Sequence, residues 1–266
     1  MSRSSSELKR RARANLTGHY RIPMEVFLLV VAIPMVLELP FSMLRSEYST
    51  TLQTVIYYLA EFLISLVTTV LTAGQIRIHI FMARKKDYTT GYVFWGINHH
   101  PDRIILVGLL IAGLSFLASI PMLYGTYLMN QVLGGQGLFS IDLNSLEPVL
   151  MKFALLALLT LLIQVIIDLF LQLPFYLLMD YDQMTAGECI KIGVDLMKGQ
   201  KKRLFLLMLS FIGMDLLMFL SLGIGSLWVV PYKQQTYALF YLDVIGDLKD
   251  ELPPQPDDYQ PFQQYV

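Results

Sequence analysis

Residues 104–129 read IILVGLLIAGLSFLASIPMLYGTYLM and contain no charged side chain. An α-helix needs about 20 residues to cross about 30 Å of hydrocarbon, so this run predicts a membrane-spanning helix. The composition of the whole chain agrees with that prediction. Of its 266 residues, 55% are hydrophobic and 15% are charged, whereas roughly 25% are charged in soluble domains. We therefore predict a multi-pass membrane protein.

Apolar runs on both sides of this stretch complete an all-α, polytopic membrane helix bundle with six predicted spans. They cover residues 26–44, 52–73, 104–129, 153–179, 204–222 and 223–242, within a membrane domain over 1–245. The acidic, proline-rich residues 246–266 predict a disordered cytoplasmic tail.

Most of the 20 basic residues lie in alternate connections between the predicted spans. They occur before the first span, between the second and third, and between the fourth and fifth. Because basic residues near span ends stay on the cytoplasmic side, both termini are predicted to be cytoplasmic, which requires an even number of crossings. The expected location is the plasma membrane of a bacterium.

The segments before the first and fifth spans look like copies of one unit. SSSE at residues 4–7 and TAGE at 185–188 both match the capping-box pattern of a helix start. Each is followed at the same spacing by a glycine, Gly18 or Gly199. A weaker third copy covers residues 89–103. We predict three transmembrane hairpins, each preceded by a cytoplasmic, interfacial, amphipathic helix.

Basic residues near these helices are candidates for binding anionic lipid headgroups, at roughly 1 kcal/mol each. They are Arg10, Arg11, Arg13, Lys201, Lys202 and Arg203. The alternative is that any helix between two spans lies in the interface and is amphipathic for that reason alone. The expected partners are the lipid bilayer, anionic headgroups and another membrane protein. The net charge of -1 argues against nucleic acid.

Five ionisable residues lie inside predicted spans, where such a group costs about 2.5–3.5 kcal/mol. They are Glu38, Glu61, Asp168, Asp215 and Lys233. Asp215 and Lys233 are equally far in sequence from Ile224, in the predicted turn between the last two spans. Equal helical rise brings both to the same depth, so we predict an intramembrane ion pair between them.

Glu38, Glu61 and Asp168 have no basic residue as a partner inside a predicted span. Either each is protonated in a helix interface or near water, or Glu61 and Asp168 form a transport site near mid-membrane. Transport sites are often built from broken helices. Candidate positions for breaks are Pro34, Pro40, Pro121, Pro174 and Pro231.

Catalytic patterns are absent from the sequence. It contains no G-x-S-x-G elbow, no Walker A loop and no H-E-x-x-H zinc motif, so no catalytic, cofactor-binding or metal-binding residue is predicted. With a single cysteine, no internal disulfide framework can form. We expect a protein that is not an enzyme.

The opening ELK at 7–9 through GHYR at 18–21, and LGIG at 222–225 through FY at 240–241, carry a family resemblance. The chain resembles the bacterial integral-membrane family known as domain of unknown function 975. The layout is also similar to the membrane part of some glycerophosphodiester phosphodiesterases, without their catalytic barrel. The resemblance implies no catalytic residues.

Two functions remain open from the sequence. One is a non-enzymatic component that organises, or assists assembly at, the cytoplasmic leaflet through its basic helices. The other is a small secondary transporter or export factor that uses Glu61 and Asp168.

Overall fold

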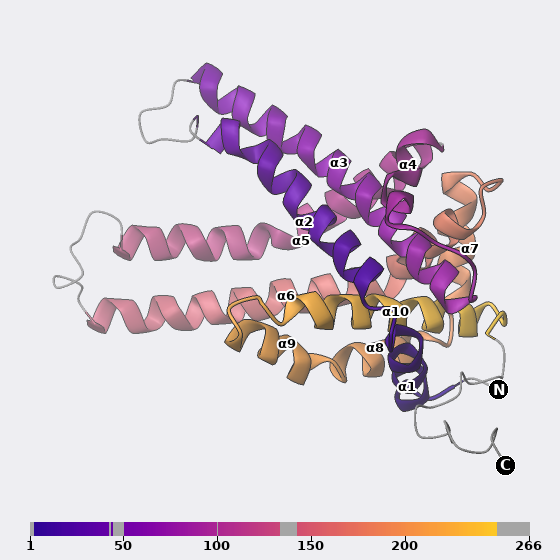
Figure 1. Cartoon of the computed structure of the whole chain (residues 1–266). Helices are drawn as coiled ribbons and strands as arrows, with labels where there is room; N and C mark the ends of the chain where they lie inside the picture. Colours follow the sequence, from indigo (N-terminus) through magenta and orange to yellow (C-terminus); the bar gives the residue numbers. More distant parts are fainter. Residues whose placement is uncertain (1–2, 43, 45–50, 100, 134–142, 249–266) are drawn as a thin grey trace, which may run out of the picture.

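The computed structural model describes residues 3–42, 44, 51–99, 101–133 and 143–248, and these ranges contain helices and connections but no strand (Figure 1). In chain order the helices are α1 (Ser5–Leu16), α2 (Arg21–Ser42), α3 (Thr51–Ala83), the 3-10 helix η1 (Thr90–Phe94), α4 (Trp95–Asn98), α5 (Pro101–Leu133), α6 (Leu143–Asp180), α7 (Ala186–Leu196), α8 (Lys201–Leu209), α9 (Ile212–Leu220) and α10 (Ser226–Val244). The all-α prediction is confirmed for this part of the chain. The predicted tail beyond residue 248 lies outside it.

Five stretches of helix are long and apolar enough to cross a membrane. They lie in α2, in α3, in α5, in α6, and across the α8–α9 pair. This finding indicates a membrane protein. Helix α10, the predicted sixth span, is not among the five, so length and composition do not establish the six-span arrangement. Polar residues in the middle of α10 lower its hydropathy, and two of them, Gln235 and Thr236, are buried against other helices.

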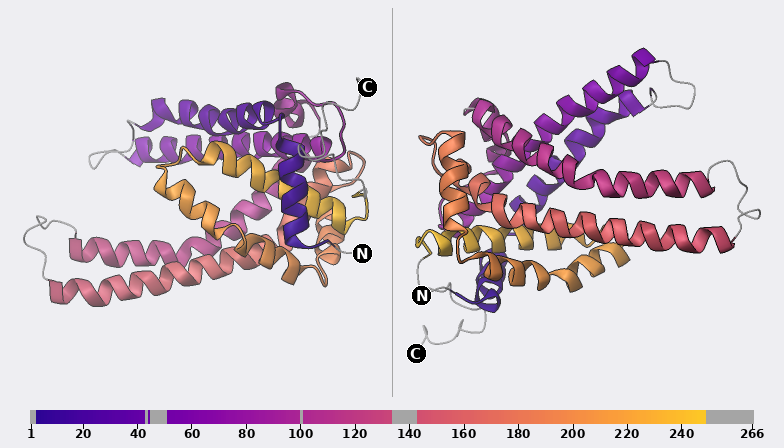
Figure 2. Two further views of the ribbon diagram at one scale, coloured as in Figure 1. Left: turned by 60° about the horizontal axis from the view of Figure 1, so that its bottom comes forward. Right: turned by 180° about the vertical axis from the view of Figure 1, so that it is seen from behind.

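The long helices pack in pairs that spread from one end of the molecule. Helix α2 packs on α3, α5 packs on α6, and α9 packs on α10. We call the end at which α3, α6 and α10 finish the convergent end. Figures 1 and 2 show the α2–α3 and α5–α6 pairs diverging away from it, with both ends of the described chain beside it.

The two predicted helix starts are present. The backbone N–H of Glu7 donates to the Ser4 hydroxyl at 3.3 Å, and Thr185 and Glu188 form a complete capping box. The glycines that follow, Gly18 and Gly199, have φ angles of +77° and +79°. This left-handed conformation ends each helix in the same way. The third copy contains only the short helices η1 and α4.

Helices α1 and α7 bury their apolar faces against protein rather than lipid. On α1, Leu8, Ala12 and Leu16 are at most 1% exposed, and the helix contacts α3, α8 and α10. On α7, Cys189 is buried, and a Cβ added at Gly193 would lie 2.6 Å from the ring of Pro174 in α6. These apolar faces attach the two helices to the convergent end of the bundle.

The helix break lies where the sequence did not predict one. Pro34, Pro40, Pro121, Pro174 and Pro231 all lie inside helices. The predicted span 204–222 is instead divided between Leu209 and Ile212. Lys9 of α1 stabilises this break, because its Nζ donates to the Ser210 carbonyl at 2.6 Å and lies 3.9 Å from the centre of the Phe211 ring.

Candidate functional site

A network of ion pairs joins the helices at the convergent end. Arg84, directly after α3, binds Asp180 at the end of α6 through two nitrogens, with Nη2 at 2.7 Å from Oδ2. Its Nε donates to Asp247 at 2.6 Å, and the Tyr241 hydroxyl donates to Asp180 at 2.7 Å. The hydrogen bond to Asp180 raises the pKa of Arg84, although burial opposes the shift. The guanidinium therefore stays charged.

A second group of this network surrounds Asp243, whose side chain is 1% exposed at the end of α10. Arg3 donates from Nη1 at 2.7 Å, and Arg203 of α8 donates to the other carboxylate oxygen. Burial acts to raise the pKa of Asp243, but the hydrogen bonds from Arg203 and Arg3 outweigh it and hold the pKa below its ordinary value. The carboxylate thus joins the chain start, α8 and α10.

Arg77 of α3 makes the third connection. It donates to the Met179 carbonyl at 2.8 Å and to Asp182 at 3.0 Å. Its guanidinium carbon lies 3.8 Å from the centre of the Trp95 ring in α4. From the sequence these arginines were predicted to orient the chain and, for Arg203, to bind lipid headgroups, but their acidic partners were not predicted. The available signal was the set of acidic residues in the same connections.

The structure divides the six headgroup candidates into two groups. Arg10, Arg13 and Lys202 are exposed. Arg11 is 5% exposed and binds Glu7 at 3.0 Å, so it does not face lipid. The other two also have protein partners: Arg203 binds Asp243, and Lys201 lies 3.4 Å from the centre of the Phe170 ring.

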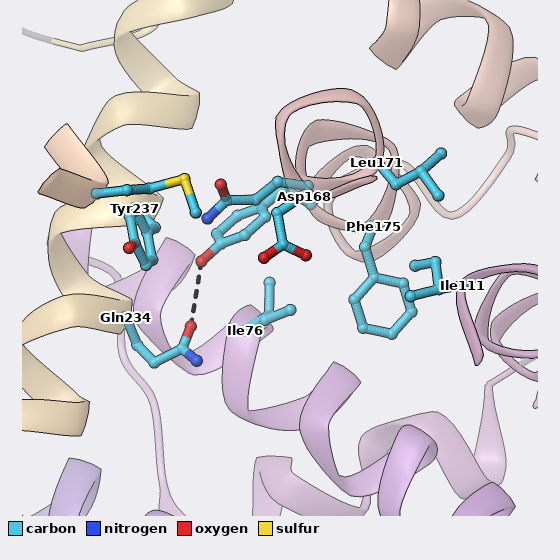
Figure 3. Close-up of a pocket in the computed structure, with 10 residues that line it drawn as sticks. Ile76, Ile111, Asp168, Leu171, Phe175, Gln234 and Tyr237 are labelled. Atoms are coloured by element: carbon cyan, nitrogen blue, oxygen red, sulfur yellow. Dashed lines mark hydrogen bonds between the residues drawn. The ribbon is translucent and has the colours of Figure 1, made fainter. Parts of the chain in front are cut away.

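A pocket of about 260 Å³ lies where the helix pairs meet (Figure 3). Its walls come from α3, α5, α6, α8 and α10, and they are mostly apolar or aromatic with one carboxylate. The lining residues are Ile76, Ile111, Asp168, Leu171, Gln172, Phe175, Tyr176, Met208, Gln234 and Tyr237. In Figure 3 the Asp168 carboxylate points in among the labelled Ile76, Phe175 and Gln234. Asp168 is therefore the predicted acid that reaches a cavity.

Glu61 and Glu38 are exposed on the outside of α3 and α2. Glu61 is not among the residues that line the pocket, and it precedes the lining residue Ile76 by about 22 Å of helix at about 1.5 Å per residue. Glu61 and Asp168, the two acids of the predicted transport site, therefore do not share this pocket. The reason is that α3 diverges from α6 away from the convergent end.

Asp215 and Lys233 do meet. The Lys233 Nζ lies 2.7 Å from Asp215 Oδ1, so the predicted contact between the two side chains is present. The predicted turn between the helices is also present, with φ angles of +52° at Leu222 and +88° at Gly223. The pair fastens α9 to α10.

His79 of α3 is fully buried. Its Nδ1 is 2.9 Å from the Gln235 amide oxygen of α10, and the buried Gln75 precedes it by one helical turn. The one-turn spacing of polar side chains on α3 was the available signal. Within the described ranges, no three His, Cys, Asp or Glu side chains are placed to hold a metal ion.

Residues 1–247 match the family model described as "Protein of unknown function (DUF975)". The chain belongs to this family. The match covers all of the described helices and confirms the resemblance seen in the sequence. No curated protein and no solved structure is significantly similar to this DUF975 chain.

Proposed function

We propose that this DUF975 protein is a non-enzymatic organiser at the cytoplasmic leaflet of a bacterial plasma membrane. In this proposal α10 is the sixth span, and the convergent end with both termini faces the cytoplasm. The outward face of α1 contacts anionic lipid headgroups, and the ion-pair network gives a membrane-protein partner a rigid platform.

The direction of α10 supports six crossings. It runs back from the turn after α9 to the convergent end, where α3 and α6 also finish (Figure 1). Its polar residues need no contact with lipid, because Gln235 and Thr236 are fully buried and Gln234 accepts a hydrogen bond from Tyr176 at 3.2 Å. A span shielded by other spans can carry such residues.

The observation that carries the lipid proposal is the orientation of α1. The helix lies across the direction of the long helices (Figure 2). Leu8, Ala12 and Leu16 face the protein, whereas Arg10 and Arg13 are exposed. Neither arginine makes an ion pair with the described residues, so both charges are available to headgroup phosphates.

Lipid preference tests the proposal. The full chain is purified in mixed micelles of phosphatidylglycerol and phosphatidylcholine, and the bound lipids are counted by native mass spectrometry. The double variant Arg10→Gln with Arg13→Gln should reduce the preference for the anionic lipid about thirtyfold, at roughly 1 kcal/mol for each charge.

The matched control changes Lys191 of α7 and Lys198, in the turn that follows α7, to Gln. These lysines are exposed but alternate with exposed Glu188 and Asp195, so that face carries no excess positive charge. The control should keep the wild-type preference. An equal loss in both double variants, or no loss in either, would contradict the role of α1.

The pocket favours a second candidate function, a small secondary transporter or export factor in which Asp168 carries the site without Glu61. Asp168→Asn should then abolish transport by cells without lowering the amount of protein in the membrane. Glu61→Gln should have no effect.

A further inference from the structure

We propose that the pocket around Asp168 binds a small primary ammonium compound with an apolar body. Five helices supply its walls, including α10 at the centre of the molecule. Its volume of about 260 Å³ is just under the roughly 300–1,000 Å³ of pockets for drug-sized ligands, which selects a small ligand.

The charge of the pocket selects a cation. Asp168 accepts one hydrogen bond, from the Gln164 amide at 3.2 Å, and makes no ion pair with any residue that the structure describes. Lys233, next to the lining residue Gln234, is held by Asp215 at 2.7 Å. An opposite charge stabilises a carboxylate that is held away from water, and a bound ammonium group supplies one.

An unpartnered acceptor beside Asp168 favours a cation that donates hydrogen bonds. The Gln172 amide oxygen, on the turn of α6 that follows Asp168, is buried and has no partner in the described part of the chain. It is an acceptor without a donor. A primary ammonium carries three N–H donors, enough for the Asp168 carboxylate and this oxygen together, whereas a quaternary ammonium carries none.

The walls select an apolar or aromatic body for the ligand. Phe175, Tyr176 and Tyr237 present rings to the cavity, and Ile76 and Leu171 are among the aliphatic side chains between them. Rings stabilise a nearby cation and an apolar group alike. Figure 3 shows Phe175 and Tyr237 on opposite sides of the Asp168 carboxylate.

Calorimetric titration tests the proposal on the full chain in lipid nanodiscs at pH 7. The two probes are 2-phenylethylamine and 2-phenylethanol, which have nearly the same shape and differ in the ammonium group. The amine should bind at least about tenfold more tightly than the alcohol. Equal affinity of the two probes, or no binding of the amine at millimolar concentration, would overturn the proposal.

Two variants test whether the amine binds in this pocket. Asp168→Asn keeps the shape of the side chain but removes its charge, and it should weaken amine binding at least about tenfold. Glu61→Gln removes an acid from another surface of the bundle and should leave the affinity unchanged. An Asp168→Asn variant that binds the amine like the wild type would sink the assignment.

The test remains decisive even if Asp168→Asn is less stable than the wild type. Asp168 is bonded only to Gln164 in the described structure, so Asp168→Asn should melt at or above the wild-type temperature without ligand. If it melts lower, the two probes on the wild-type protein still decide the question. Lipid preference does not enter either measurement, so this proposal stands or falls separately from the role of α1.

Discussion

Arg84 and Asp180 form a two-point ion pair between the ends of α3 and α6, with Arg84 Nη2 at 2.7 Å from Asp180 Oδ2. The two residues are 96 positions apart in the sequence. The pairs α2–α3 and α5–α6 diverge beyond this point (Figure 1). The ion pair therefore links the helix pairs α2–α3 and α5–α6 at the end from which they diverge.

Arg84→Lys should lower the free energy of unfolding by about 2 kcal/mol, because an ammonium cannot replace the paired guanidinium bonds to a buried carboxylate. Reversible unfolding in mixed micelles gives the value. Lys86→Gln in the same connection is the control, since Lys86 is exposed and should change the stability by less than about 0.5 kcal/mol. Equal effects of the two substitutions would argue against the ion pair.

Low pH should lower the stability of the folded protein, because it protonates Asp243 at the convergent end. Its pKa in the folded protein lies below the ordinary value of about 3.9, because the bonds from Arg203 and Arg3 outweigh burial. The stabilisation is thus complete above pH of about 4 and disappears as the pH falls through the lowered folded pKa. Unfolding measured between neutral and strongly acidic pH should show this loss.

Asp243→Asn is the companion variant. It should be less stable than the wild type by about 3 kcal/mol at neutral pH, because two partly buried arginines lose their counter-charge. Its stability should also change less with acid. A variant with the same acid dependence as the wild type would show that another group is responsible.

The contributions of Asp215 and Lys233 to the free energy of unfolding should be coupled. Asp215→Asn or Lys233→Gln alone leaves one charge without its partner, whereas the double variant leaves none. The double variant should therefore lose less stability than the sum of the single losses, with a coupling energy of roughly 0.5–3 kcal/mol. A double-mutant cycle of unfolding free energies measures it, and strictly additive losses would deny the coupling.

Gly193 should tolerate no side chain. A Cβ there would lie 2.6 Å from both Cδ and N of Pro174, so Gly193→Ala must move α7 away from α6 and should cost about 1–3 kcal/mol. Gly187→Ala on the same helix is the matched control, because its Cβ would meet nothing within 4 Å. That control should be neutral or stabilising, by up to about 1 kcal/mol. Melting temperatures of the two variants make the comparison.

The sequence predicted the features that depend on neighbouring residues. Apolar runs located the long helices, and the S/T-x-x-E pattern located the starts of α1 and α7. Equal spacing from one turn predicted the contact of Asp215 with Lys233. In each of these cases the deciding residues lie within one helix or one hairpin.

Features that depend on distant partners were missed. Nothing near Ser210 signals a helix break, since the stabilising Lys9 comes from the other end of the chain. Counting basic residues gives an orientation but does not reveal that Arg203 and Arg11 are held by acids. The spacing of Gln75 and His79 marks a polar face on α3, but the partner of His79, Gln235 of α10, lies far along the chain.

The orientation of the convergent end is the central claim, and cysteine labelling of intact cells tests it most directly. The native Cys189 is fully buried and adds little background. Lys202→Cys, exposed at the convergent end, should react with a membrane-impermeant maleimide only after the cells are permeabilised. Leu222→Cys, 94% exposed in the turn between α9 and α10, should react in intact cells. Labelling of Lys202→Cys in intact cells would contradict the account.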